Sequence, residues 1–342
     1  MTIKQIPPAA VICGILLISF PTQAQVPMTY LIGHGTKAYP VVALTWGTLI
    51  ISILVVLITT GLLLAGLMRR RPSLVRDRDG RLPVILPGGG LSWIWIGTGV
   101  TFLVLLGTVV WNFEVLAQVY APAQKPGLRL EITGHQWWWE VRYTSDQPEL
   151  NFTTANEIHI PVGIPVQVVL RGADVIHSFW VPALTGKMDT IPGQNNVTWF
   201  EASKPGVFRG QCTEYCGEEH AKMALFVIAE STQDFAQWRQ NQVASAAAPA
   251  NPDVAAGQQA FTVRCGECHT VRGTDAGGIA GPDLSHLMTR RTIAAGLLNN
   301  TPGNLSGWIA NPQQLKPDAL MPNLQLTGEE LTQIRRFLET LS

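Results

Sequence analysis

The chain has 342 residues, of which 46% are hydrophobic, and its 24 basic and 24 acidic residues give a formal net charge of zero. A chain of this length is too long for one small domain, and its apolar residues are too unevenly distributed for a wholly soluble protein. The charge is uneven as well. Segment 69–81 holds six arginines and two aspartates, a surplus of four positive charges, so the remainder of the chain carries four net negative charges.

Residues 1–24 have the three parts of a secretory signal peptide. Lys4 stands near the start, an apolar stretch covers residues 9–20, and the small residues Thr22 and Ala24 are placed for cleavage. The alternative is a retained first membrane helix, which the shortness of the apolar stretch disfavours. We therefore expect this segment to be removed from the mature protein.

Two uncharged stretches, residues 41–68 and 91–113, are each long enough to cross the roughly 30 Å hydrocarbon core of a bilayer as a helix. The arginine-rich segment between them is short, so the positive-inside rule places it in the cytoplasm. A buried hairpin of a soluble protein is the alternative, but the length and the flanking arginines favour the membrane. Segment 25–120 is thus expected to anchor the chain in a bacterial-type inner membrane with two helices, and the rest lies on the outer, periplasmic side.

After the second stretch the pattern changes to short runs of β-branched and aromatic residues with alternating polarity. Predicted strands, separated by Pro and Gly turns, cover residues 128–133, 137–143, 166–171, 197–201 and 223–229. Such a series predicts a β-sandwich over residues 121–243, which ends with a helix over residues 232–242.

Residues 244–252 are rich in Ala and Pro and predict a semi-rigid linker. Segment 253–342 then has helical signals. Asp253 is predicted to cap a helix that runs to about Val263, and Thr327 with Glu330 predicts a capping box for the last helix. The expected fold is therefore multidomain: two transmembrane helices, a β-sandwich and an all-α C-terminal domain.

A first group of metal-binding residue types occupies a twelve-residue segment inside the predicted sandwich. Its members are Cys212, Cys216, His220 and Met223. Soft sulfur ligands with imidazole favour copper, and two cysteines four residues apart on a loop can each bridge two metal ions. The second histidine expected of such a centre is His177, because it follows a predicted strand of the same sandwich. A disulfide between the cysteines is the alternative reading in an oxidising compartment.

A second group is Cys265-Gly266-Glu267-Cys268-His269, whose spacing predicts covalent haem attachment through both thiols and iron ligation by the histidine. A redox-active dithiol is the alternative, but it is expected in a βαβ unit rather than in a short helical domain. Met321 is the predicted sixth ligand of the iron. Met288 and His286 compete with it, but they follow His269 so closely that little chain is left to pass round the haem.

Four motifs carry a specific family resemblance: Gly134-His135-Gln136-Trp137, residues 174–178, residues 187–193 and residues 212–223. Over about 40–235 the chain resembles subunit II of cytochrome c oxidase, which implies two membrane helices and a cupredoxin-like Greek-key sandwich that holds the dinuclear copper centre CuA. Residues 253–342, which include Gly281-Pro282-Asp283-Leu284, resemble class I cytochromes c. In that family the proline carbonyl orients the ligating imidazole.

The resemblance implies roles for individual residues. The CuA ligands would be His177, Cys212, Cys216, His220, Met223 and the carbonyl of Glu214. The Glu214 side chain would also help to bind Mg²⁺ at the interface with subunit I, unless it is a solvated loop residue. Trp137 matches the tryptophan at which family members receive electrons, although it could equally serve packing. Haem c would be held by Cys265, Cys268, His269 and Met321.

Together the two resemblances imply a subunit of a respiratory haem-copper oxidase. It would pass electrons from an external donor, such as a cytochrome c or a quinol-cytochrome c reductase complex, through haem c and CuA to subunit I. Subunit I would reduce oxygen and pump protons, and subunit III and the membrane are further expected partners. No nucleic acid is expected. The alternatives are a CuA-containing subunit of a nitric oxide reductase and a membrane-tethered electron carrier that acts alone.

Overall fold

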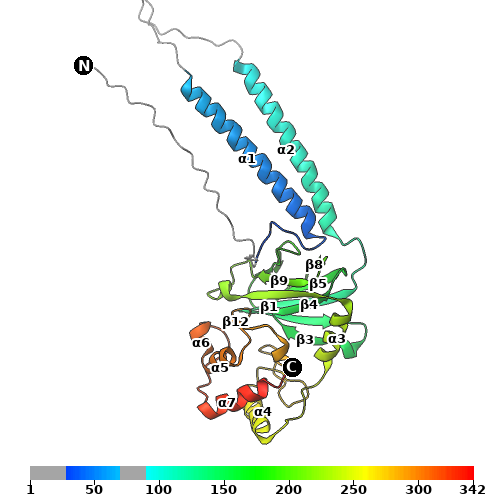
Figure 1. The fold of residues 1–342 in the computed structure, drawn as a ribbon, viewed down its shortest axis with the longest axis vertical. Helices are drawn as coiled ribbons and strands as arrows, with labels where there is room; N and C mark the ends of the chain where they lie inside the picture. Colours follow the sequence, from blue (N-terminus) through cyan, green and yellow to red (C-terminus); the bar gives the residue numbers. More distant parts are fainter. Residues whose placement is uncertain (1–27, 70–89) are drawn as a thin grey trace, which may run out of the picture.

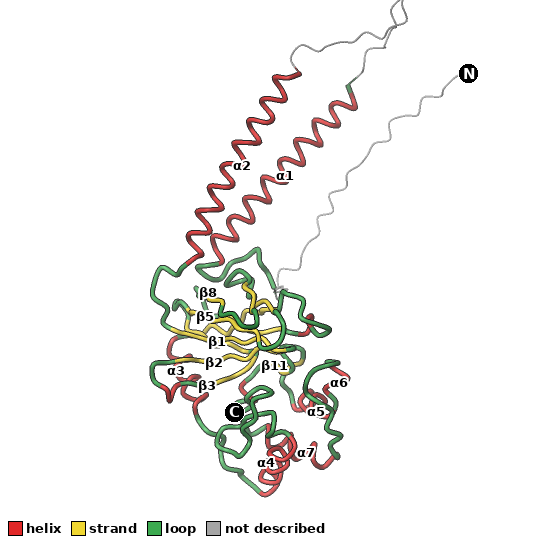
Figure 2. Tube along the Cα trace, turned by 180° about the vertical axis from the view of Figure 1, so that it is seen from behind, coloured by secondary structure: helices red, strands yellow, loops and turns green. Residues whose placement is uncertain are grey.

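The computed structural model describes residues 28–69 and 90–342. The predicted signal peptide and nearly all of the arginine-rich segment lie outside the described residues. Two long helices, α1 (Ala38–Met68) and α2 (Gly90–Tyr120), run side by side and project from one end of a β-sandwich, and a helical domain lies at the other end (Figure 1; Figure 2).

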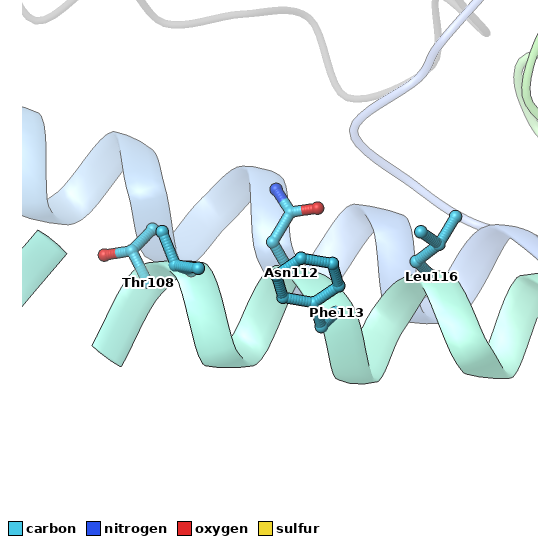
Figure 3. A pocket seen from close by; sticks show the side chains of 5 residues that line it. Thr108, Asn112, Phe113 and Leu116 are labelled. Atoms are coloured by element: carbon cyan, nitrogen blue, oxygen red, sulfur yellow. The ribbon is translucent and has the colours of Figure 1, made fainter. Parts of the chain in front are cut away.

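Both long helices are apolar and exposed along most of their length, as expected of helices that face lipid. They are longer than the uncharged stretches. Helix α1 begins at Ala38, and α2 continues past Phe113 to Tyr120. At 1.5 Å per residue each helix exceeds the hydrocarbon core, so its end can continue into the sandwich. One face of α2 carries a shallow groove lined by Thr108, Val109, Asn112, Phe113 and Leu116 (Figure 3).

The β-sandwich consists of a larger and a smaller sheet. The larger has the order β3-β2-β1-β5-β8, from β1 (Leu128–His135), β2 (Trp138–Thr144), β3 (Phe152–Ala155), β5 (Val166–Gly172) and β8 (Asn196–Phe200). The smaller has the order β4-β10-β9, from β4 (Glu157–Pro161), β9 (Gly206–Gln211) and β10 (Ala224–Glu230). A short hairpin, β6 (His177–Phe179) with β7 (Met188–Thr190), stands beside them.

The core lies between the two sheets. Alternate residues of β1, such as Leu130 and Ile132, point inward and pack with residues of the smaller sheet, such as Ile158 and Val227. This alternation places every second side chain of a strand on the same face. Helix α3 (Thr232–Val243) follows β10 and matches the helix predicted over residues 232–242 to within one residue; its cap is Ser231.

The five strands predicted from the sequence correspond to β1, β2, β5, β8 and β10, with ends that differ by one or two residues. The pattern missed β3, β4, β6, β7 and β9. These strands are short, between three and six residues, and β9 contains two glycines. Strands this short show no clear alternation of polar and apolar side chains. Their conformation is decided instead by pairing with the neighbouring strands.

The C-terminal domain consists of α4 (Pro252–Arg264), α5 (Pro302–Ala310), α6 (Pro312–Leu315) and α7 (Gly328–Leu338), with the small ladder β11 (Thr292–Ile293) and β12 (Leu298–Asn299). Helices α4 and α7 cross at Gly257, where a Cβ atom would lie 2.2 Å from the carbonyl oxygen of Gln333. Nearby, the rings of Phe261 and Phe337 pack in a tilted arrangement with centroids 5.5 Å apart. The close crossing therefore forms the centre of this domain's core.

The predicted capping box is confirmed: Thr327 and Glu330 exchange side-chain to backbone hydrogen bonds at the start of α7. The predicted cap of α4 was wrong. Asn251 caps this helix by accepting a hydrogen bond from the Val254 N–H at 3.0 Å, and Asp253 lies in the first turn. The reason is Pro252, which has no N–H to lose and therefore favours the first helical position, so that the cap must precede it.

Candidate metal and haem sites

The loop over residues 212–223 joins β9 to β10 and is closed by a hydrogen bond from the Cys212 N–H to the Met223 carbonyl at 3.0 Å. Its two cysteines are buried and face each other, with their Sγ atoms 3.8 Å apart. That separation is well beyond the 2.05 Å of a disulfide, so both thiols are free to bind a metal.

His177 reaches the same point from another part of the sandwich. Its Nε2 bonds to Asp174 Oδ1 at 2.8 Å, while its fully buried Nδ1 has no hydrogen-bond partner in the described part of the chain. The ligand atoms of His177, Cys212 and Cys216 lie within 4.8 Å of one another. A buried nitrogen that is left unpaired beside two thiols, while its ring is oriented by a carboxylate, fits a metal ligand.

The other three predicted ligands converge on the same pair of thiols. His220 Nδ1 lies 3.5 Å and Met223 Sδ 3.9 Å from Cys216 Sγ, and the Glu214 carbonyl oxygen lies 3.3 Å from Cys212 Sγ. The structure therefore brings together all six predicted ligand groups. Two thiols, two imidazoles, a thioether and one carbonyl form the soft set that copper prefers.

The two thiols have different acidities because they share a hydrogen bond. This bond lowers the pKa of Cys212, which accepts it, and raises the pKa of Cys216, which donates it. Burial and the negative charge on Cys212 raise the pKa of Cys216 further. The pair thus gives up its first proton easily and holds the second until a cation replaces it.

Trp137 lies directly against this loop and is 6% exposed. Its Nε1 donates to the Cys216 carbonyl at 2.9 Å, and Gln136 Nε2 donates to the same oxygen at 2.8 Å. Asp174 Oδ2 accepts from the Gln136 N–H at 2.7 Å, so one carboxylate orients both His177 and the segment that carries Trp137. Asp174 and Gln136 were not predicted as site residues. Their positions inside the motifs that carry the family resemblance were the only signal, since neither is itself a ligand.

The predicted haem-binding residues lie at the end of α4. Cys265 is its C-terminal cap, and Cys265 and Cys268 are both free. The Nδ1 of His269 bonds to the Pro282 carbonyl at 2.8 Å, which leaves Nε2 for a metal. A Cβ atom at Gly281 would lie 2.6 Å from this ring, so the loop presses closely against it. Burial lowers the pKa of His269, which favours the neutral imidazole that binds iron. These residues fit a covalently attached haem.

The three candidates for the sixth haem ligand differ in their surroundings. Both ring nitrogens of His286 face backbone carbonyls, those of Ser342 at 3.1 Å and Ala244 at 3.2 Å. Met288 packs against the hydrophobic core of the domain. Met321 is half-buried, and its backbone carbonyl accepts a hydrogen bond from Gln313 Nε2 at 2.8 Å. His286 and Met288 thus have structural roles, whereas the Met321 side chain lies outside the core cluster and its sulfur makes no hydrogen bond with the residues that the structure describes.

Two family models match the chain: "Cytochrome C oxidase subunit II, periplasmic domain" over residues 150–230 and "Cytochrome c" over residues 254–342. Cytochrome c oxidase subunit 2 of Alkalihalophilus pseudofirmus is 35% identical over 80% of this chain and 78% of the relative. The same subunit of Bacillus sp. strain PS3 is 30% identical over 78% of each chain.

Among solved structures, the periplasmic domain of cytochrome oxidase subunit II of Bradyrhizobium japonicum is 35% identical over 35% of this chain and 96% of that domain, with a TM-score of 0.33. The matches to both family models, and the large share of each chain over which the two relatives align, agree with the ligand sets described above. The chain therefore belongs to the cytochrome c oxidase subunit 2 family, as a subunit II with a cupredoxin-like CuA domain and a fused cytochrome c domain.

Proposed function

We propose that this subunit relays single electrons from an external donor to the oxygen-reducing, proton-pumping subunit I of a respiratory haem-copper oxidase. Bound haem c and CuA supply the one-electron redox chemistry. The observation that carries the proposal is the convergence of His177, Cys212 and Cys216, whose ligand atoms lie within 4.8 Å of one another. The Nδ1 of His177 has no hydrogen-bond partner among the described residues.

The proposed CuA ligands are His177, Cys212, Cys216, His220, Met223 and the Glu214 carbonyl. Both thiolates would be shared ligands of the copper, and their negative charge would stabilise the bound cations. The loop that carries four of these side chains is closed by backbone hydrogen bonds, and the His177 ring is fixed by Asp174. A ligand set held this firmly changes little in geometry between redox states, which favours fast transfer at low driving force.

The proposed haem-binding residues are Cys265 and Cys268 for covalent attachment, with His269 and Met321 as the ligands that would hold the iron. The hydrogen bond to Pro282 fixes the orientation of the His269 ring and makes its Nε2 a better donor to iron. The thioether of Met321 would favour ferrous iron and raise the reduction potential, which suits a late step of a chain that ends at oxygen.

Glu214 is proposed to bind Mg²⁺ through its carboxylate at the interface with subunit I. Its side chain is half-buried and makes no hydrogen bond or ion pair with the residues that the structure describes. A carboxylate left free beside the copper loop is a suitable oxygen ligand for a hard cation.

Trp137 is proposed as the residue through which electrons reach CuA. It is buried against the loop, and its indole hydrogen bond ends on the backbone of Cys216, one of the two proposed bridging ligands. Packing alone would not require that bond, because the neighbouring Trp139 is fully buried and its Nε1 has no partner in the described residues.

We further propose the placement of the chain in its complex. After removal of residues 1–24, segment 25–120 would cross the inner membrane twice, with the CuA domain (121–243), the linker (244–252) and the cytochrome c domain (253–342) on the periplasmic side. The rule that arginine-rich loops stay in the cytoplasm supports this orientation. Subunits I and III would contact the membrane helices, and a cytochrome c or a quinol-cytochrome c reductase complex would supply the electrons.

The Cys216→Ser variant in the purified complex tests the proposal. Loss of one bridging thiolate should abolish the delocalised mixed-valence signal of CuA in electron paramagnetic resonance, while the haem c spectrum stays intact. Co-purification provides the second part of the test. Subunit I and oxygen consumption should accompany the wild-type chain, whereas an isolated copper and haem protein would indicate a carrier that acts alone.

A further inference from the structure

The cytochrome c domain lies against the end of the sandwich that is remote from the membrane helices (Figure 1; Figure 2). Among the charged side chains that cross the boundary between the domains, two deeply buried ones cross it in opposite directions. Lys316 of the cytochrome c domain enters the CuA domain, and Glu157 of the CuA domain enters the cytochrome c domain. Each is only 3% exposed and ends on backbone groups of the other domain.

Lys316 follows α6, and its Nζ donates to the carbonyl oxygens of Trp137 at 2.6 Å and Lys222 at 2.9 Å. In return, Lys222 Nζ donates to the Leu315 carbonyl at 3.0 Å. Both acceptor residues belong to the copper site: Lys222 precedes the ligand Met223, and Trp137 bonds to Cys216. The lysine therefore fastens the cytochrome c domain directly to the CuA loop.

The segment that carries Lys316 also leads to the proposed haem ligand. Gln313 Nε2 donates to the carbonyls of Ala319 at 2.7 Å and Met321 at 2.8 Å. These bonds hold the backbone of residues 319–321, the methionine loop, against α6. The segment 316–321 thus begins with Lys316, which bonds to the CuA loop, and ends with Met321, the proposed sixth haem ligand. A fixed position of Lys316 fixes the separation of the two redox sites.

Glu157 forms the second anchor, on β4. Its Oε1 accepts hydrogen bonds from the N–H groups of Arg291 at 2.8 Å and Thr292 at 3.0 Å, at the start of β11. Between the two anchors, the Ala224 N–H donates to the Ala295 carbonyl at 3.0 Å. Ala224 directly follows the ligand Met223, so backbone hydrogen bonds continue the interface up to the copper site.

A buried charge is costly unless it is hydrogen-bonded, and the partners of Lys316 Nζ and of Glu157 Oε1 belong to the other domain. Glu157 Oε2 is buried without a hydrogen-bond partner among the described residues, so the bonds to Oε1 are the ones that hold this carboxylate. Separation of the domains would leave these backbone groups and charges to be solvated again. The boundary also reaches Trp137, whose carbonyl is occupied by Lys316 and which is 6% exposed in the described chain. A protein arriving from solution therefore cannot reach the surface at which a separate donor would have to approach this tryptophan.

We propose that Lys316 and Glu157 are positioning residues that lock the cytochrome c domain onto the Trp137 face of the CuA domain, so that this face is an intramolecular interface closed to soluble donors. The external donor then docks on the cytochrome c domain instead. The direction of electron flow rests on the function proposed above. The locked interface does not, because it is defined by hydrogen bonds between the domains.

Amide hydrogen exchange in the purified complex tests the lock without reference to activity. The N–H groups of Ala224, Arg291 and Thr292 donate across the boundary, but none of them bonds to Lys316. In the Lys316→Met variant these three amides should exchange about tenfold faster or more, since a hydrogen bond to a charged group is lost. Glu157→Ala should similarly accelerate exchange at Ala224, and the double variant should do so by a larger factor.

Arg336→Met is the matched control. It removes an exposed ion pair with Asp253 at 2.7 Å, between α7 and α4, away from the boundary. Exchange at the three amides should remain at the wild-type rate. The CuA resonance signal and the haem spectrum should be unchanged in every variant, which shows that both domains remain folded.

Electron transfer from photoreduced haem c to CuA completes the test, and it should slow in Lys316→Met but not in Arg336→Met. If the three amides exchange alike in both variants, the lock is refuted, whatever the transfer rate. If wild-type protein shows no transfer between the two groups while exchange responds to Lys316→Met, the proposed direction of electron flow fails and the lock stands.

Discussion

Trp137 and Cys216 are joined by a hydrogen bond from the indole Nε1 to the carbonyl oxygen at 2.9 Å, and this bond links the boundary between the domains to a proposed bridging ligand of CuA. The carbonyl of the same tryptophan accepts from Lys316 of the cytochrome c domain. A continuous path of covalent and hydrogen bonds therefore leads from the methionine loop through Trp137 to the copper loop.

Trp137→Phe should slow electron transfer into CuA several-fold while copper content and the CuA signal remain unchanged. Phenylalanine keeps an aromatic ring but removes the N–H, and Gln136 still holds the Cys216 carbonyl at 2.8 Å. Flash reduction of haem c followed by CuA absorbance measures the rate. Trp238→Phe is the control, because this indole, which belongs to α3, stacks on His159 of β4 rather than on the loop. Equal rates in the two variants would leave Trp137 with a packing role alone.

Glu214→Gln should leave copper content unchanged and weaken the proposed Mg²⁺ site. The main-chain carbonyl that approaches Cys212 Sγ at 3.3 Å is retained, whereas the carboxylate charge that a hard cation prefers is lost. Metal analysis and the resonance signal of Mn²⁺ substituted for Mg²⁺ measure the two sites. Glu218→Gln, an exposed glutamate of the same loop, should affect neither. Copper loss that parallels Mg²⁺ loss would show that the two roles cannot be separated.

The sequence could predict the ligand groups because their residue types and spacing are local. Cys212, Cys216, His220 and Met223 lie on a single loop, and His177 was found because it follows a predicted strand of the same sandwich, residues 166–171. The sequence also predicted five strands of the sandwich, β1, β2, β5, β8 and β10, where alternating polarity coincides with β-branched or aromatic residues.

The supporting contacts could not be predicted in this way. Lys316 lies 179 residues from Trp137 in sequence and bonds to backbone carbonyls, which carry no sequence signature. Glu157 likewise bonds to N–H groups that any residue could supply. In the sequence both look like ordinary exposed charges, and only the docking of the two domains buries them.

Gly257→Ala should destabilise the cytochrome c domain by about 1–3 kcal/mol, although alanine normally favours a helix over glycine. The added methyl group would lie 2.2 Å from the Gln333 carbonyl oxygen, so α4 and α7 must move apart. Gly303→Ala in α5 is the control, since nothing lies within 4 Å of its added methyl group, and it should be neutral or slightly stabilising. Thermal unfolding followed by haem absorbance measures both. Equal melting temperatures would mean that the helices do not cross this closely.

The Met321→His variant tests the sixth ligand of haem c. A second imidazole in place of the thioether should lower the midpoint potential, on the order of 100 mV, because the thioether favours ferrous iron. The sulfur-to-iron band near the red end of the ferric spectrum should disappear. The haem should stay covalently attached, since Cys265 and Cys268 are unchanged. Redox titration and optical spectra of the purified complex measure these effects.

Met288→Leu is the matched control for this variant. The Met288 side chain packs against the core of the domain, and leucine fills a similar volume without sulfur. It should therefore leave the band and the potential unchanged. The opposite result, with an altered spectrum for Met288→Leu and a wild-type spectrum for Met321→His, would transfer the role to Met288. His286 cannot take it without breaking contacts, because its two ring nitrogens face the carbonyls of Ser342 and Ala244. A ligand must have a free donor atom, and among the three candidates Met321 is the one whose side chain neither packs in the core cluster nor faces a hydrogen-bond partner among the described residues.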